Sequence, residues 1–166
     1  IAIRNAQGDM LLFLGDDHRF WGDGGLDHLY RERQELCDER GNNKLVYLAN
    51  VNRATLTYPK ANTVKPVYSS LHCALLDREL MSQVKEPGYA DIRFVGVYWD
   101  CDFAMRLNEV GIEFAQSSTI WCEEYRDKRN KYRLHHICKP HDINVLNKLW
   151  VRKLTKEDKV PSEEIW

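Results

Sequence analysis

Hydrophobic positions along the chain fall either into short unbroken runs or into stretches with helical spacing. Residues 10–14 and 45–49 are short apolar runs bounded by polar residues and glycines, which predicts buried strands. The segment opened by Asp23 repeats apolar residues every three or four positions and ends at Gly41, which predicts a helix. Because residues 10–14 are apolar throughout, we expect them to lie in a parallel sheet.

The second half of the chain continues with the same two patterns. Residues 67–76 predict a strand that leads into a short helix at 77–81. A helix is expected from Asp100, which also serves as its cap, to Gly111. The remaining expected elements are strands at 112–114 and 119–122 and a helix at 142–151 capped by Asp142. This mixture of strands and helices predicts an α/β fold.

Composition narrows the class of protein but adds little about function. The 166 residues are 43% hydrophobic and 30% charged, as in an ordinary soluble domain. The formal net charge of -1 provides no field that would attract nucleic acid, and no apolar stretch approaches the ~20 residues that span a bilayer. The odd number of scattered cysteines argues against a disulfide framework and for a reducing, cytoplasmic compartment. These cysteines are Cys37, Cys73, Cys101, Cys122 and Cys138.

Two adjacent carboxylates, Asp16 and Asp17, follow directly after the predicted strand at 10–14. Ligands of open α/β sheets bind beyond the carboxyl ends of the strands. Two carboxylates at such a place repel each other unless a cation or a proton separates them, and a hard divalent ion that carries a phosphate suits them. The alternative is a solvated turn, because Asp is common in turns after strands.

A second acidic cluster lies at the start of the predicted helix from Asp100, with Asp102 in its first turn. Acidic residues there favour the helix dipole, so a capped amphipathic helix explains them without any function. A carboxylate that is held rigid and ionised at this position also suits a general base. Asp100 can therefore combine both roles.

A third cluster, His135, Cys138 and His141, carries ligand-type side chains at the short spacing that fits a zinc site. A closed zinc site normally needs four ligands, however, and Pro140 interrupts a regular helix here. One of these histidines joining the site of Asp17 is the other interpretation. Aromatic residues flank both acidic clusters and are expected to pack in the core, with one or two available to stack on a sugar. They are Phe20, Trp21, Tyr89, Phe94, Tyr98 and Trp99.

Residues 6–17 resemble the A-x-G-(D/E)-x-(I/L)-x-F-L-D-x-D segment of the large inverting family-2 glycosyltransferases with the GT-A fold. Residues 98–107, with Gly111, resemble the E-D-x-D-(L/F)-x-x-R-(L/F)-x-x-x-G segment of that family. Three further stretches are similar to the strand and turn before this motif, to a G-x-F-D segment and to a closing K-W helix: residues 69–80, 88–91 and 142–150. The order of the segments matches over most of residues 1–150.

The resemblance implies a GT-A fold, a Rossmann-like mixed sheet flanked by helices, over residues 1–152, followed by a polar tail at 153–166. It implies a metal-dependent, inverting transferase that moves a sugar from a nucleotide-diphosphate donor to a carbohydrate or other hydroxyl acceptor. Such enzymes usually begin with a nucleotide-binding βαβ segment, and none precedes Ile1 in this sequence. We therefore expect an incomplete N-terminus, with that segment supplied upstream. Many such enzymes work at membranes, so peripheral membrane association stays open.

The resemblance also implies roles for individual residues. The strand-end pair would bind the nucleotide-sugar through Mn²⁺ or Mg²⁺, with Asp17 at the metal position and Asp16 facing the metal or the nucleotide. Asp100 resembles the catalytic base that deprotonates the acceptor hydroxyl. The remaining residues expected at the nucleotide-sugar site, around the start of that helix and the loop over it, are Trp99, Asp102 and Arg106.

The sequence departs from the family pattern at three positions. Gly15 stands where the family has its first Asp, and Trp99 replaces the Glu before the base. Cys122 stands near where the family often places a His that touches the metal or the diphosphate, with Glu123, Glu124 or a later His as substitutes. Gly15, Trp99 and the missing start favour an alternative function, a degenerate GT-A domain that binds carbohydrate or serves assembly without catalysis. A zinc-organised interaction domain at 135–141 is a third interpretation.

Overall fold

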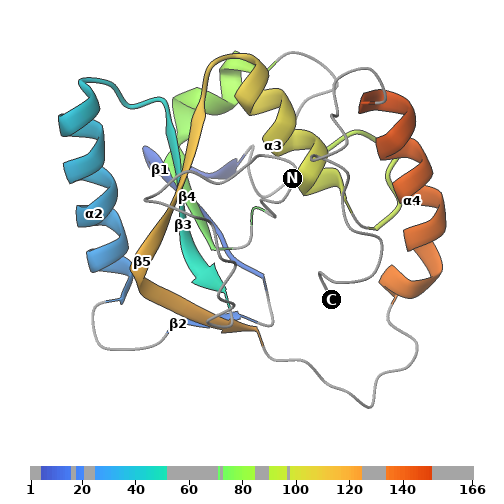
Figure 1. Cartoon of the computed structure of the whole chain (residues 1–166), viewed down its shortest axis with the longest axis horizontal. Helices are drawn as coiled ribbons and strands as arrows, with labels where there is room; N and C mark the ends of the chain where they lie inside the picture. The colour runs from blue at the N-terminus through green and yellow to red at the C-terminus, as the bar shows by residue number, and fades with distance from the viewer. Residues whose placement is uncertain are drawn as a thin grey trace.

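The computed structural model describes residues 5–15, 18–20, 25–51, 71, 73–84, 90–96, 98–124 and 134–150. The strands in these ranges are β1 (Met10–Phe13), β2 (His18–Phe20), β3 (Leu45–Val51), β4 (Ala74–Asp77) and β5 (Glu113–Glu124). The helices are α2 (Gly25–Arg40), the short 3-10 helix η2 (Arg78–Gln83), α3 (Trp99–Glu109) and α4 (Leu134–Trp150). Figure 1 shows α2 on one side of the sheet, α3 on the other, and α4 beyond α3. The predicted α/β class is confirmed.

The sheet is mixed, with the strand order β1-β4-β3-β5-β2. β3 and β5 run parallel at its centre, and β4 is antiparallel to β3. β1 pairs antiparallel with β4 at one edge, so the expectation of a parallel strand at residues 10–14 is wrong. Met10 and Leu12 pack toward α2, whereas Leu11 and Phe13 pack toward α3. Burial on both faces, rather than parallel pairing, explains the unbroken apolar run.

The core consists of two apolar layers, one on each face of the sheet. Alternate residues of β3 enter the two layers, because side chains along a strand point to opposite faces. Leu45, Tyr47 and Ala49 pack toward α2, and Val46 and Leu48 pack toward α3. All five are buried, as the continuous apolar run predicts.

Helix α2 is anchored to the sheet by a buried arginine. The Arg33 guanidinium donates hydrogen bonds from Nη2 to Asp77 Oδ2 (2.9 Å) and from Nη2 and Nε to the Leu45 carbonyl (3.2 and 3.3 Å). Its side chain is 1% exposed, and its charge is met by the Asp77 carboxylate at the end of β4. The helix ends at Gly41, whose φ of 67° is readily adopted by glycine, as the sequence predicts.

Helix α3 and strand β5 are joined by a very short turn. Gly111, with φ 81°, ends the helix as predicted, and the Ile112 amide donates back to the Leu107 carbonyl (3.1 Å). Since β5 begins at once, the C-terminus of α3 lies where β5 and its parallel neighbour β3 start. The N-terminus of α3, with Asp100, therefore extends toward the carboxyl ends of those strands.

Residues 113–124 form one strand, so the expectation of separate strands at 112–114 and 119–122 is wrong. The polar stretch between them indicated a break. The pairing with β3 shifts register between Leu48 and Asn50, which is where β5 accommodates that stretch. Ser117 Oγ accepts hydrogen bonds from the Thr119 and Ile120 amides (3.1 and 2.8 Å), so the strand continues through it.

Helix α4 begins earlier than predicted and continues through Pro140. Asp142 is thus an interior residue and not a cap, contrary to expectation. It is fully buried because its carboxylate accepts hydrogen bonds from the amides of Val95 and Gly96 (2.9 and 2.8 Å) in the segment before α3. A cluster of apolar residues joins α4 to α3: Phe94, Tyr98, Cys101, Met105, Leu146 and Trp150.

Several predictions concern parts of the chain outside the described residues. The polar tail at 153–166 and the strand expected from residue 67 up to residue 70 are among them. Among the described helices, none combines the length and apolar character needed to cross a membrane.

Candidate functional site

The carboxyl ends of β3 and β5 meet at one edge of the sheet, with Val51 opposite Cys122. Strand β2 completes this edge by pairing with the end of β5, which places His18 opposite Glu124. This is the edge where ligands of α/β sheets usually bind. Asp16 and Asp17 lie outside the described residues, and their metal role stays a prediction. The described residues on either side of them are tied together, because the His18 amide donates to the Gly15 carbonyl (3.1 Å).

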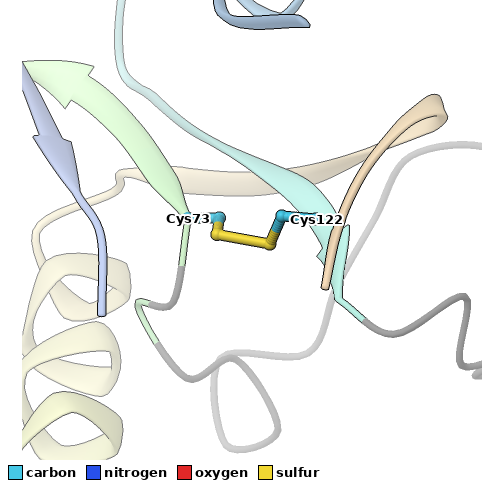
Figure 2. The surroundings of a disulfide bond; sticks show 2 residues. All are labelled: Cys73 and Cys122. Carbon is cyan, nitrogen blue, oxygen red and sulfur yellow. A yellow bond between two sulfur atoms is a disulfide. The ribbon is translucent and has the colours of Figure 1, made fainter. Parts of the chain in front are cut away.

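The same edge carries a disulfide between Cys73 and Cys122. Figure 2 shows the two side chains pointing toward each other, Cys73 from the residue before β4 and Cys122 from β5. Cys73 has a φ of 53°, and its carbonyl accepts a hydrogen bond from the Ala49 amide (3.0 Å). The two cysteines are 49 residues apart and come from segments on opposite sides of β3.

The expectation that the cysteines form no disulfide is therefore wrong for this pair. The count and spacing of the cysteines contain no signal for it, because only the sheet brings Cys73 and Cys122 together. The other three cysteines are free and buried: Cys37, Cys101 and Cys138. His18 is a further residue that sequence reasoning missed; one of its ring nitrogens lies within 4.8 Å of both sulfurs. The one available signal was its position directly after the two aspartates.

Asp100 is the second residue of α3 and is 8% exposed. It is not the N-cap that the sequence predicts. Tyr98 occupies that position with a φ of 61° and makes no side-chain capping bond, while its carbonyl accepts the first helical hydrogen bond from the Asp102 amide (3.0 Å). The turn is set by this left-handed residue, which the sequence pattern does not reveal.

The thiol next to Asp100 is kept protonated. Burial raises the pKa of Cys101 well above its usual value, and the charge of the Asp100 carboxylate and a hydrogen bond to it raise that pKa further. The Cys101 thiol therefore acts as a donor to the Asp100 carboxylate. This contact gives the predicted base a fixed neighbour.

Asp102 is held by two partners that come from different helices. It accepts hydrogen bonds from Trp150 Nε1 in α4 and from Arg106 Nε one turn along α3, both at 2.9 Å. The Arg106 guanidinium also lies 5.3 Å from the centre of the Phe103 ring, within cation–π range. Asp102 thus ties the start of α3 to α4, and Arg106 holds the Asp102 carboxylate from within α3. Their predicted contact with a nucleotide-sugar, and that of half-buried Trp99, stay predictions.

The segment that leads into α3 is held by a second buried carboxylate. Asp91 is 3% exposed and accepts hydrogen bonds from Arg93 Nε at 2.9 Å to each of its oxygens. These bonds to Arg93 lower the pKa of Asp91 below its usual value, against the opposing effect of burial. Together with Asp142, this pair fixes the backbone just before Tyr98.

The described members of the third sequence cluster differ in burial, since Cys138 is buried and His141 is exposed. Cys138 is buried next to Gly96, and the His141 ring contacts the Asp142 carboxylate through Nδ1 (2.7 Å). The side chain of His135 is outside the described residues. The described part of α4 thus offers no observation that favours zinc at 135–141, and that site stays a prediction.

A surface depression lies at the opposite edge of the sheet, where β3 starts and β4 ends. It is lined by Asp9, Asn43, Asp77, Arg78, Glu79, Met81 and Ser82. None of these residues belongs to the clusters that the sequence singles out. The candidate site is therefore the carboxyl edge of β3 and β5.

No protein-family profile matches the chain, and no curated protein matches it in sequence. Solved structures do resemble it. The structure of S. aureus TarS residues 1–349 aligns over 72% of this chain and 37% of its own, with 14% identity and a TM-score of 0.50. A second structure of S. aureus TarS aligns over 95% of this chain and 33% of its own, with 12% identity and a TM-score of 0.54.

This chain therefore shares an α/β fold with the aligned part of S. aureus TarS. At identities this low the likeness shows the fold alone. The chain spans about a third of the length of the TarS chains that it matches.

Proposed function

We propose that this chain is a GT-A-type, family-2-like glycosyltransferase domain that transfers a sugar from a nucleotide-diphosphate donor to an acceptor hydroxyl with inversion. The proposal is supported by two observations: residues that flank the first acidic segment lie at the carboxyl edge of β3 and β5, and the helix that carries the second segment starts on the side of that edge. Residues flanking Asp16 and Asp17 belong to the carboxyl edge of β3 and β5. The start of α3, with Asp100, extends toward the same edge.

The first acidic segment suits the donor. Asp16 and Asp17 offer carboxylate oxygens, the hard ligands that Mn²⁺ and Mg²⁺ accept, so their chemistry fits the implied ion. A divalent ion held there would offset the charge that grows on the departing nucleoside diphosphate. The two aspartates would thereby fix the diphosphate at the carboxyl edge of β3 and β5.

The second acidic segment suits the acceptor. Asp100 would take the proton from the acceptor hydroxyl as that oxygen attacks the anomeric carbon of the sugar. The bond from this carbon to the diphosphate oxygen breaks on the opposite face, which inverts the anomeric centre. The bonds of Asp102 to Trp150 and Arg106 support this role, because they hold the first turn of α3 in place.

The decisive variant is Asp100→Asn, which keeps the size of the side chain and removes its basicity. Donor binding is measured by isothermal titration of UDP or GDP with and without Mn²⁺, and transfer by loss of the nucleotide-sugar. The protein is used with whatever sequence precedes Ile1 in its natural chain. We expect transfer to fall by roughly 100- to 10,000-fold with donor binding retained. Asp17→Asn should instead abolish the part of donor binding that depends on Mn²⁺.

Asp38→Asn is the matched control, because Asp38 is an exposed carboxylate on α2, away from this edge. It should leave both binding and transfer unchanged. A fully active Asp100→Asn protein would remove the assigned base. Donor binding that is indifferent to Mn²⁺ in the unsubstituted protein would remove the metal from the proposal.

A second candidate function is carbohydrate binding without catalysis. It is favoured by the burial of Asp100, at 8% exposed, and by Trp99 in place of the expected Glu. Such a domain would bind sugars without turnover. Hydrolysis or transfer of any nucleotide-sugar by the unsubstituted protein would eliminate this candidate.

A further inference from the structure

We propose that His18, Cys73 and Cys122 form a binding site for a soft divalent metal ion, zinc above all, when the Cys73–Cys122 disulfide is reduced. The ligand atoms of these three residues lie within 4.8 Å of one another. The site is separate in chemistry from the aspartate pair in the proposed function, and it holds whether or not the chain transfers sugars.

The spacing suits a tetrahedral ion. Zinc binds sulfur at about 2.3 Å and imidazole nitrogen at about 2.0 Å, so its ligand atoms lie roughly 3.5–3.8 Å apart. The observed spread of the three ligand atoms requires only small side-chain movements to reach this arrangement. A water or substrate oxygen can occupy the fourth position, as in zinc sites with three protein ligands.

The distance between the Cα atoms of the two cysteines favours an ion bound between the sulfurs. Their Cα atoms are 7.3 Å apart, beyond the approximately 4.4–6.8 Å at which disulfides usually form. An ion between the sulfurs would occupy the extra distance. The dithiol form of this pair can therefore accept a metal without the strands moving together.

Each ligand is held by the sheet. His18 begins β2 and is paired with the end of β5, Cys122 lies opposite Val51, and the Cys73 carbonyl is bonded to the Ala49 amide. Three segments that are distant in sequence are thus fixed to the ends of the central strands. A site built on paired strands requires little ordering when the ion binds.

The three proposed ligands differ in their exposure to solvent. Both cysteines are completely buried, at 0% exposed, whereas His18 is half-buried. Thiolate and imidazole ligands prefer zinc or other soft ions, while carboxylates prefer magnesium and manganese. The cluster should therefore discriminate against the hard ions proposed for Asp16 and Asp17.

The reduced form of the Cys73–Cys122 pair arises by thiol–disulfide exchange. Two low-molecular-weight thiols reduce the Cys73–Cys122 bond, and they leave as one disulfide while the protein gains two thiol groups. Zinc then binds the two sulfurs and a His18 nitrogen, and the two thiol protons are released to solvent. In the reverse direction, a low-molecular-weight disulfide oxidises the pair, takes up its two electrons as two thiolates, and frees the ion.

The test uses Co²⁺ as a spectroscopic probe for zinc on the reduced chain. We expect one Co²⁺ per chain, with thiolate-to-cobalt charge-transfer absorption and the strong ligand-field bands of a tetrahedral ion, both displaced by Zn²⁺. His18→Asn should weaken binding by more than the roughly 10–100-fold that loss of an outer-shell partner costs, because it removes a direct ligand. Cys122→Ser should remove part of the charge-transfer absorption.

The matched controls are His28→Asn, at an exposed position of α2, and Cys37→Ser, at a free buried cysteine. Both should bind Co²⁺ as the unsubstituted chain does. His18→Asn keeps both cysteines, so it tests the proposal even if the serine variant fails to fold. Absence of Co²⁺ binding after full reduction would overturn the proposal. Equal binding by the His18 and His28 variants, or displacement of Co²⁺ by stoichiometric Mn²⁺, would overturn it as well.

Discussion

Single buried carboxylates decide how the segment before α3 is held. Asp91 keeps its charge because Arg93 meets both of its oxygens, whereas Asp102 shares its oxygens between Arg106 and the Trp150 indole. A buried carboxylate without such partners would be destabilising by several kcal/mol. These partners allow the chain to place several acids close to the proposed base without losing stability.

Asp91→Asn tests this balance through its pH dependence. The pKa of Asp91 is lower in the folded than in the unfolded chain, so its stabilising effect is complete above about pH 4 and disappears as the pH falls through the folded value. At pH 7 we expect the variant to be less stable by about 1 kcal/mol, because Arg93 is 57% exposed and the pair is partly screened. Urea unfolding at pH 7 and at about pH 2 measures the difference, which should be smaller at the lower pH.

Glu39→Gln, at an exposed position of α2, is the control and should change stability by less than about 0.5 kcal/mol at either pH. A stability loss for Asp91→Asn that is the same at both pH values would show that the carboxylate charge is not what stabilises the fold.

At the scale of elements, α4 acts as a support for α3 and for the segment that enters it. The Asp142 carboxylate in the middle of α4 accepts hydrogen bonds from the amides of Val95 and Gly96. At the end of the helix, the Trp150 indole donates a hydrogen bond to Asp102. The helix therefore fixes the approach to α3 and its first turn at two separate points. Any chemistry assigned to Asp100 depends on this support.

Asp142→Ala should destabilise the fold by about 3 kcal/mol. The substitution leaves two backbone amides without their acceptor in a buried place, and each unsatisfied group costs about 1–3 kcal/mol. Asn144→Ala, at an exposed position of the same helix, should cost less than about 0.5 kcal/mol. Urea denaturation compares the two variants. Similar midpoints for both would mean that Asp142 does not hold residues 95 and 96 in solution.

At the scale of the whole molecule, the carboxyl edge of the sheet is closed by a link between distant parts of the chain. The Cys73–Cys122 disulfide joins segments on either side of β3. Both cysteines pack in the apolar layer on the face of the sheet that carries α2 in Figure 1, so the link lies on that face. Breaking the disulfide increases the conformational entropy of the unfolded chain more than that of the folded chain, and it therefore favours unfolding.

Reduction of the disulfide should lower stability by up to about 4 kcal/mol, the chain-entropy value for a loop of this length. Cys73→Ser should lose a similar amount and should no longer respond to reductant. Cys37→Ala should respond as the unsubstituted chain does, because Cys37 is free. Thermal unfolding with and without reductant, in the presence of a metal chelator, measures the change. Equal stability in both conditions would show that the pair is not bonded in solution.

Local patterns in the sequence were sufficient for most single elements. The apolar run at 45–49 is buried on both faces of β3, and Gly41 and Gly111 end their helices with positive φ values. These features depend on neighbours within a few residues, which is the range that hydrophobic spacing and glycine preferences report. The two acidic segments, with their proposed roles, were likewise identified from adjacent residues.

Only the tertiary structure decided which distant segments meet. The edge position of β1, the interior place of Asp142 and the contact of His18 with Cys73 and Cys122 all depend on pairing between strands and packing between helices. The same apolar run is found in central strands and in covered edge strands. The sequence around a cysteine does not show whether another cysteine lies beside it in the fold. Contacts between residues many positions apart are set by the global balance of burial and chain entropy, which no short segment encodes.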